Sequence, residues 1–291
     1  MNLKIFLLCF QMFNMTLSDK IVTFPGTVTA TNYSIQLSEI SFEKCAENCL
    51  SNIDCVAFLV TENCSIYTFE QLISVQNIVS SNQIVGIKIN GSDSETCPSS
   101  FSSLDLSGSV RSLSYNFITA SSPGLFNFNR SSCSNGWKLF RRVRGYYCIK
   151  IFFPKSDSDV FNSSYCKQYS AYLTGFDNQN EIDYIYSAMQ TKYGTTDNKY
   201  LAIDGIRKPS CYTSTKIKCG EFEWTNNYSS TPMFFEWDSG EPSGVEYWGT
   251  QENCLSVQFK GTSKKYANDI GCESDLINGH VCGMPIGDWD N

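Results

Sequence analysis

Five side chains with oxygen ligands lie close together between positions 241 and 269 of the sequence. They are three carboxylates, one hydroxyl and one amide: Glu241, Ser243, Glu252, Asn268 and Asp269. Hard cations such as Ca2+ take six to eight oxygen ligands in flexible geometry, and none of the five residues is a His or a Cys. This set therefore predicts a calcium site. A disulfide between Cys254 and Cys272 would hold the separate parts of the set near each other.

The charges of this set also favour a bound cation. Glu241, Glu252 and Asp269 repel one another strongly if they lie within a few ångströms without a counter-ion. An X-Pro peptide bond such as Glu241–Pro242 adopts the cis form more readily than other bonds, which would turn the flanking oxygens in one direction. Extracellular calcium modules bind the ion at roughly 0.1–1 mM, and we expect a site in that range.

The same stretch resembles the long-loop region of C-type lectin-like domains. Glu241-Pro242-Ser243 corresponds to the Glu-Pro-Asn triplet of that family, Glu252-Asn253-Cys254 to its Glu-Asp-Cys, and Ala267-Asn268-Asp269 to its Trp-Asn-Asp. In the family these side chains ligate calcium and hydrogen-bond two sugar hydroxyls. The resemblance therefore implies that all five oxygen-bearing residues form the metal site and the carbohydrate site of a calcium-dependent lectin. The glycan is left open between mannose and galactose types.

Ser243 is the main departure from the family pattern. An Asn offers a carbonyl to the ion and an amide to a sugar hydroxyl, whereas Ser has one short hydroxyl. Two alternatives therefore stay open: a lectin-like fold that binds calcium without sugar, and an extracellular protein-interaction module with a degenerate sugar site. Tyr247 and Trp248, in the loop that follows, either stack on a galactose-like sugar or pack inward.

Catalysis has little support in the sequence, and we expect no enzyme activity. Glu241 and Glu252 could act as a glycosidase acid pair, but their neighbours are metal-ligand types rather than a substrate cleft. His280 is the only His and lies within a strand pattern, so we interpret it as a core residue. A zinc enzyme with several His ligands is excluded. No G-x-S-x-G nucleophile elbow is present.

Residues 133–284 carry the rest of the lectin resemblance, which implies an α+β fold with two helices, antiparallel sheets and a long loop region. Residues 162–173 and 180–189 are the predicted helices, and the apolar stripe of the second is typical of core packing. Residues 201–206 and 277–282 are predicted strands, and residues 285–291 a tail. Resemblance and proximity predict four disulfides: Cys133 with Cys148, Cys166 with Cys282, Cys211 with Cys219, and Cys254 with Cys272.

Residues 19–97 form a smaller predicted domain. Residues 40–50 have apolar residues and cysteines at helical spacing, and residues 83–89 alternate with the period of a half-buried strand. The spacing C-x3-C-x5-C-x2-F-x5-C resembles the PAN/apple-like module, in the variant (CW domain) that nematode secreted proteins carry beside lectin domains. The resemblance implies disulfides between Cys45 and Cys64 and between Cys49 and Cys55. Residues 98–132 are rich in Ser and Asn, which favours a linker, although their aromatics argue against full disorder.

The N-terminus and the cysteine content predict a secreted, extracellular protein. Residues 1–17 combine Lys4 with a short apolar run, which is typical of a signal peptide rather than a hydrophobic strand. No other run reaches the ~20 apolar residues of a membrane span. The 14 cysteines favour an oxidising compartment. Six sequons would permit glycosylation of exposed loops: Asn32, Asn63, Asn90, Asn129, Asn162 and Asn227.

The net charge of −7 argues against nucleic acid as a partner, because an acidic chain gains no counter-ion release from phosphates. One cationic cluster departs from this balance: Lys138, Arg141, Arg142 and Arg144. It is interpreted as a solvated strand edge, with an anionic-glycan patch as the alternative. Removal of Cys9 with the signal peptide leaves 13 cysteines, and Cys97 is the one outside the predicted pairs. An exposed Cys97 would link a homodimer or another secreted protein, unless it is buried or capped.

Overall fold

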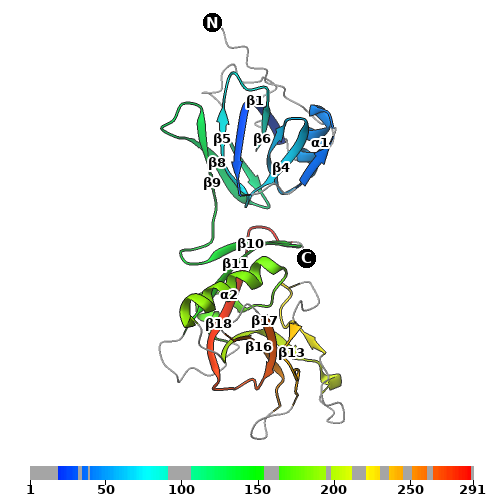
Figure 1. Cartoon of the computed structure of the whole chain (residues 1–291), viewed down its shortest axis with the longest axis vertical. Helices are drawn as coiled ribbons and strands as arrows, with labels where there is room; N and C mark the ends of the chain where they lie inside the picture. The colour runs from blue at the N-terminus through cyan, green and yellow to red at the C-terminus, as the bar shows by residue number, and fades with distance from the viewer. Residues whose placement is uncertain are drawn as a thin grey trace. The chain divides into compact units, whose positions relative to one another are not determined.

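The computed structural model describes residues 19–31, 35–38, 40–90, 106–153, 164–194, 198–211, 221–229, 236–244, 251–260 and 265–289. The chain divides into two compact units, Met1–Ser132 and Cys133–Asn291, and each is described by itself (Figure 1). The predicted signal peptide and Cys97 lie outside the described residues. Within those residues, no helix has the length and apolar character needed to cross a bilayer.

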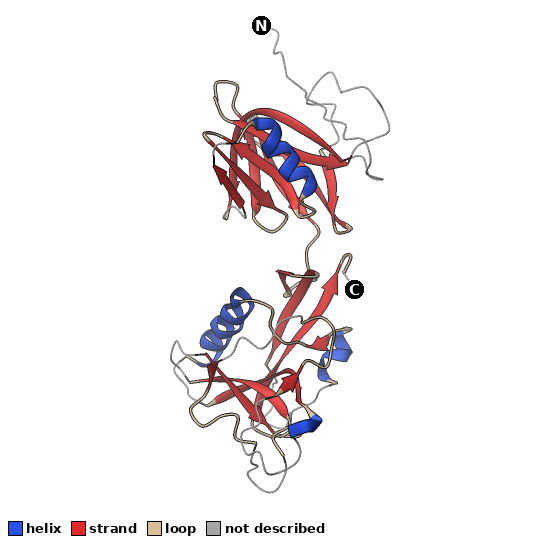
Figure 2. Cartoon of the chain, turned by 90° about the vertical axis from the view of Figure 1, so that its right-hand side faces the viewer, coloured by secondary structure: helices blue, strands red, loops and turns tan. Residues whose placement is uncertain are grey.

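The first unit is built on one antiparallel sheet of nine strands in the order β2-β4-β3-β6-β1-β5-β9-β8-β7. The strands are β1 (Asp19–Ala30), β2 (Ile35–Ser38), β3 (Cys55–Val60), β4 (Asn63–Thr68), β5 (Leu72–Asn77), β6 (Ile84–Asn90), β7 (Ser107–Val110), β8 (Leu113–Thr119) and β9 (Leu125–Arg130). The single α-helix of this unit among the described residues, α1 (Phe42–Ser51), lies against one face of the sheet (Figure 2).

Local sequence explains α1 and its attachment to the sheet. The hydroxyl of the N-cap residue Ser41 accepts a hydrogen bond from the backbone N–H of Lys44 at 3.3 Å, as Ser does at many helix starts. Residues four apart share one helix face, so Cys45 and Cys49 both face inward. Disulfides join Cys45 to Cys64 and Cys49 to Cys55, which confirms both predicted pairs.

The prediction of a linker over residues 98–132 is wrong for residues 107–130, which form β7, β8 and β9. β9 pairs with β5 in the register Val75↔Phe126 and so extends the sheet of the first unit. Tyr115, Phe117 and Phe128 pack together on this extension, with Tyr115 and Phe128 ring centroids 5.3 Å apart. Alternating aromatics bury one face of these strands, and that burial outweighs the flexibility expected from Ser and Gly.

The second unit contains a mixed sheet in the order β10-β11-β18-β13-β16-β17-β15, with β12 on β18 and β14 on β13. The β13–β18 and β15–β17 pairs are parallel, and the other pairs are antiparallel. The strands are β10 (Lys138–Arg142), β11 (Gly145–Phe152), β12 (Tyr172–Leu173), β13 (Lys199–Arg207), β14 (Phe222–Glu223), β15 (Glu236–Trp237), β16 (Cys254–Phe259), β17 (Lys265–Ile270) and β18 (Ile277–Ile286).

The two predicted helices of this unit have different outcomes. Residues 179–193 form α2 (Gln179–Tyr193), and the stripe Ile182, Ile185, Tyr186 and Met189 is buried in the core as predicted. The N-cap Asn178 accepts a hydrogen bond from Glu181 N–H at 3.1 Å. The prediction of the first helix is wrong for the described residues of its segment, which form a short 3-10 helix, η2 (Tyr165–Tyr169), followed by strand β12. The 3-10 helix ends at Ser170, whose φ of 55° is incompatible with a continued helix.

Disulfides close this unit at both ends of its sequence. Cys133–Cys148, Cys166–Cys282 and Cys254–Cys272 are present as predicted. Cys211, in the short 3-10 helix η3 (Pro209–Cys211), is disulfide-bonded. Its predicted partner Cys219 lies outside the described residues, so that pair stays a prediction. The prediction of a tail from residue 285 is wrong in part, because β18 continues to Ile286 and Trp289 packs on Tyr147 at 5.6 Å.

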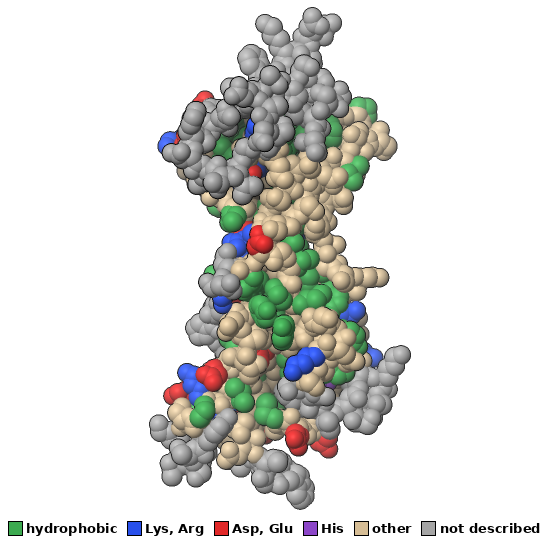
Figure 3. Space-filling view, turned by 180° about the vertical axis from the view of Figure 1, so that it is seen from behind, with side chains coloured by type: hydrophobic (Ala, Val, Ile, Leu, Met, Phe, Trp, Pro, Cys, Tyr) green, Lys and Arg blue, Asp and Glu red, His purple; other side chains and the backbone are tan. Residues whose placement is uncertain are grey.

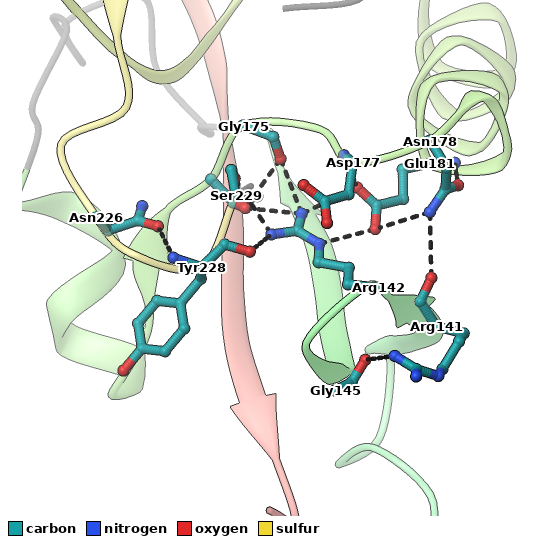
Figure 4. Close-up of polar contacts among 11 residues, drawn as sticks. Arg141, Arg142, Gly145, Gly175, Asp177, Asn178, Glu181, Asn226, Tyr228 and Ser229 are labelled. Carbon is teal, nitrogen blue, oxygen red and sulfur yellow. Dashed lines mark hydrogen bonds and ion pairs between the residues drawn. The ribbon is translucent and has the colours of Figure 1, made fainter. Parts of the chain in front are cut away.

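Arg142, one of the four residues of the predicted cationic cluster, lies buried in the interior rather than at a solvated strand edge (Figure 4). Its guanidinium donates to both carboxylate oxygens of Glu181, at 2.8 and 2.9 Å, and both side chains are fully buried. Burial raises the pKa of the Glu181 carboxyl, and the charge of Arg142 opposes that shift. On the face of the molecule shown in Figure 3, the Lys and Arg side chains lie apart rather than in one patch.

Candidate metal and carbohydrate site

The strand pair β16–β17 positions the C-terminal part of the site. The two strands are antiparallel, with Leu255 opposite Asp269 and Ser256 opposite Asn268, and the Cys254–Cys272 disulfide closes their open end. Glu252 precedes β16 by two residues. Asp269 is the next-to-last residue of the paired strand β17, so strand pairing fixes its backbone, whereas Glu252 lies outside a strand.

Glu241, the third carboxylate, lies in the segment that follows β15. Parallel pairing of β15 with β17 places Trp237 beside Ala267 and fixes where this segment starts. Backbone hydrogen bonds then fold it back, with Asp238 N–H donating to Ala267 at 3.2 Å and Glu241 N–H donating to Asp238 at 2.9 Å. The Glu241–Pro242 peptide bond is cis.

These elements bring Glu241, Glu252 and Asp269 into one cluster, named here the acidic cluster. One carboxylate oxygen of each residue lies within 4.8 Å of the others. Glu241 and Glu252 are partly exposed, whereas Asp269 is fully buried. Three of the five predicted site residues therefore meet as the sequence implied, although they come from separate segments.

Ser243 lies at the centre of the acidic cluster. Its backbone N–H donates to Glu241 Oε2 at 2.8 Å and to Asp269 Oδ1 at 2.9 Å, and its hydroxyl donates to Glu252. Gly244 N–H donates to Asp269 Oδ2 at 2.8 Å. Ser243 thus contacts every carboxylate as a hydrogen-bond donor, which is a different role from the oxygen ligand that the sequence predicted.

Asn268 stands apart from this network in the described part of the chain. Its side-chain amide donates to the backbone carbonyl of Asp269 at 2.6 Å, and no hydrogen bond joins it to the three carboxylates. Neighbouring residues of a strand point to opposite faces, which accounts for the separation of Asn268 from the Asp269 side chain. The Oδ1 atom of Asn268 could coordinate an ion.

Arg207 is the residue of this site that the sequence did not predict. Its guanidinium forms an ion pair with Asp269, and the two side chains are 4% and 0% exposed. It also donates to the backbone carbonyl of Glu252, at 2.8 Å from Nη2 and 3.2 Å from Nε. The available signal was a single Arg at the end of the otherwise mostly apolar strand β13.

Electrostatic repulsion persists despite Arg207, because one guanidinium faces three carboxylates. Burial raises the pKa of Glu241 to about 7, and the adjacent Asp269 adds to the shift. The acidic cluster therefore favours a proton or a second cation near Glu241.

The spacing of the acidic cluster fits a calcium ion. Oxygen ligands lie 2.3–2.6 Å from Ca2+, so two ligands of one ion are at most about 5 Å apart. The 4.8 Å limit among the three carboxylates meets that condition. Asp269 differs from the two Glu residues because both its oxygens already accept hydrogen bonds. Oδ1 accepts from Ser243 N–H, and Oδ2 accepts from Arg207 and Gly244.

Comparison with known proteins agrees with this architecture. Residues 140–281 match a family model described as C-type lectin domain-containing protein 141/158, and residues 21–89 match the PAN-like domain model. The second domain is a C-type lectin domain. The first is a PAN-like domain, so the chain has the α+β organisation expected from its sequence. No curated protein matches the chain.

Several solved structures of C-type lectins are similar to the second domain. The human scavenger receptor C-type lectin carbohydrate-recognition domain is 17% identical, with 53% of this chain and 100% of that chain covered and a TM-score of 0.36. The Ca2+-independent C-type lectin SPL-2 from Saxidomus purpuratus is 19% identical, with 54% and 96% covered and a TM-score of 0.36. A GlcNAc complex of SPL-1 is 19% identical, with 52% and 94% covered and a TM-score of 0.34.

The remaining predicted residues of the lectin domain act in packing. Trp224 and Trp237 are half-buried against the core, where the Trp237 ring lies 5.6 Å from that of Phe222. His280 is fully buried and stacks on Tyr165 with ring centroids 4.2 Å apart, in agreement with its interpretation as a core residue. Tyr247 and Trp248 lie outside the described residues.

Proposed function

We propose that the lectin domain binds carbohydrate in a calcium-dependent manner at the acidic cluster. The observation that carries this proposal is the meeting of Glu241, Glu252 and Asp269, with one oxygen of each within 4.8 Å of the others. Three carboxylates from separate segments repel one another, and a divalent cation removes that cost. Ser243 and Asn268 complete the proposed set of five residues, which together form both the metal site and the sugar site.

Each residue has a distinct part in this proposal. Asp269, buried and held by a strand, would anchor the metal, while the partly exposed Glu241 and Glu252 would face both the metal and the sugar. Ser243 orients all three carboxylates through its N–H and hydroxyl donors. When bound, the calcium ion supplies coordination positions for two adjacent hydroxyls of a mannose- or galactose-type sugar.

The disulfides support an extracellular setting. Five pairs lie in the described residues, and such density is typical of proteins that mature in an oxidising compartment. We therefore propose that the protein is secreted. A calcium affinity of roughly 0.1–1 mM, usual for extracellular modules, would suit that setting.

Retention on sugar resins tests this proposal. Wild-type protein is applied to mannose and galactose resins in calcium, and release is attempted with a chelator. We expect chelator-dependent retention on one of the two, and its loss in Glu241→Gln, with calcium affinity weakened tenfold or more (~1.4 kcal/mol) in calorimetry. Glu236→Gln removes an exposed carboxylate of the same segment and should behave as wild type.

Arg207 favours a second candidate function, in which the domain binds its partner without calcium. A cation built into the protein already pairs with Asp269, so the acidic cluster has a partial counter-ion at all times. In that case the lectin fold would serve as an extracellular protein-interaction module with a degenerate sugar site. Wild-type protein would then show neither calcium heat nor a calcium-dependent rise in melting temperature, and resin retention would be absent or insensitive to chelator.

A further inference from the structure

A groove of about 740 Å³ lies in the lectin domain outside the acidic cluster. Its lining includes Tyr172, Asp204, Asn227, Tyr228 and Trp289. Pockets of this volume are large enough to hold a small ligand. The groove is therefore large enough for an occupant that the proposed calcium site does not supply.

Aromatic rings form one wall of this groove. The Tyr172 and Tyr228 centroids are 5.3 Å apart, and the Tyr228 and Trp289 centroids are 5.4 Å apart. Tyr172 is 43% exposed, so its ring offers an open face. Figure 4 shows the ring of Tyr228 directed away from the Arg142 cluster. Such faces bind flat apolar surfaces such as the C–H face of a pyranose.

The lining residue Asn227 begins the sequon Asn227-Tyr228-Ser229. Its side chain is exposed, and no hydrogen-bond partner engages its amide within the described residues. The backbone around it is fixed, because Arg144 Nη1 donates to the Asn227 carbonyl and Arg142 Nη1 to the Tyr228 carbonyl, both at 2.8 Å. A free amide is thus held at the edge of the aromatic wall.

The other sequons whose three residues are all described lack this combination. Asn63 is half-buried at the start of β4, and the middle residue of its sequon, Cys64, is fully buried in a disulfide. Asn129 is exposed in β9, but its amide donates to Asn116 Oδ1 at 3.0 Å. Among these fully described sequons, Asn227 therefore combines an unengaged amide with an adjacent cavity.

We infer that Asn227 carries an N-linked glycan whose first sugars pack in this groove against Tyr172 and Tyr228. In the transfer, the Asn227 amide nitrogen bonds to the anomeric carbon of a sugar on a lipid-diphosphate carrier, the carrier leaves as its diphosphate, and the amide loses one proton. The attached sugar then lies beside the tyrosine faces because its anchor lines the groove. This glycan covers the aromatic wall and stabilises the lectin domain.

Two measurements on full-length protein secreted from a eukaryotic host test this inference. Peptide mass mapping should show a glycan on Asn227, absent in Asn227→Gln. A double-mutant cycle then reports packing: Asn227→Gln should lower the melting temperature by about 2–4 °C in the wild-type background and by less than half of that in Tyr172→Ala. Tyr172→Phe keeps the ring and should behave as wild type, and Asn129→Gln should leave the lectin-domain transition unchanged.

Three outcomes would overturn the inference. An unmodified Asn227 in the secreted protein would show that the inferred glycan is absent. An equal loss of melting temperature in the wild-type and Tyr172→Ala backgrounds shows that the glycan does not use the aromatic wall. Equal melting temperatures for wild type and Asn227→Gln would show that the glycan does not stabilise the lectin domain.

Discussion

Arg207 and Asp269 form a buried ion pair in the acidic cluster of the lectin domain. They lie 62 residues apart in the sequence and meet because β13 and β17 flank β16 in the sheet. The carboxylate that a calcium ion would need most is therefore already paired with a cation. Arg207 consequently sets how strongly the acidic cluster attracts a metal.

Substitution of Arg207 should lower the stability of the calcium-free protein and raise its affinity for calcium. Without calcium, Arg207→Gln leaves Asp269 buried without its cation and should lower the free energy of unfolding by about 3–5 kcal/mol. Calcium affinity should rise at least about tenfold, or ~1.4 kcal/mol, because the competing charge is gone. Calorimetry and thermal unfolding, each with calcium and with chelator, measure both effects.

Two further variants make this prediction specific. Arg207→Lys retains the charge and should keep calcium affinity near the wild-type value. Lys208→Gln removes one positive charge from the next residue, outside the acidic cluster, and should change neither quantity. Equal calcium affinity in wild type and Arg207→Gln would show that Arg207 does not compete with the metal.

Ser243→Asn should strengthen calcium-dependent binding to mannose-type sugars. The Ser243 side chain offers one hydroxyl, which donates to Glu252. An Asn side chain at this position would offer a carbonyl to the metal and an amide N–H to a sugar hydroxyl. The measurement is retention on a mannose resin in calcium. Ser239→Asn, an exposed position in the same segment, is the control. No gain in Ser243→Asn would place the limit on sugar binding elsewhere in the site.

The raised pKa of Glu241, about 7 against an ordinary 4.5, predicts a pH dependence with a definite sign. Burial is its main cause and Asp269 the next, so the folded protein holds this proton more tightly than the unfolded chain. The resulting stabilisation is complete below about pH 4.5 and is lost as pH rises through about 7. The melting temperature of the calcium-free protein should therefore fall between about pH 4.5 and pH 7.

Calcium reverses this trend, because the metal binds the deprotonated carboxylate and competes with the proton. Calcium affinity should rise over the same pH range. Glu241→Gln has no titrating group at this position and should flatten the calcium-free profile. Identical profiles in wild type and Glu241→Gln would assign the pH dependence to another group.

Cys97 remains the cysteine without an intrachain partner among the predicted pairs. An exposed thiol in an oxidising compartment forms a bond with another thiol, and we expect a disulfide-linked homodimer or a bond to another secreted protein. Two linked copies would bring two lectin domains together and increase avidity for clustered sugars. Non-reducing electrophoresis of wild type beside Cys97→Ser decides the matter, since a monomer-sized wild-type band rules the covalent bond out.

The sequence by itself determined those features that depend on local pattern. Cysteine spacing and the family motifs predicted five disulfides that the structure contains, and the apolar stripe of residues 182–189 predicted the buried face of α2. Glu241, Glu252 and Asp269 were also predicted to meet. Helical periodicity carries over into the fold, because a helix buries its residues according to their own separations. The disulfides, which include Cys166–Cys282 across 116 residues, were predictable through the resemblance to known families.

The tertiary structure alone decided the features that depend on distant partners. Residues 107–130 have a linker-like composition, and only pairing with β5 makes them strands of the PAN-like unit. Ser243 became a donor to three carboxylates because they surround it, and Arg207 became their counter-ion because sheet order places it beside Asp269. Such contacts follow from strand register and burial, which join residues whose separation in the sequence carries no pattern.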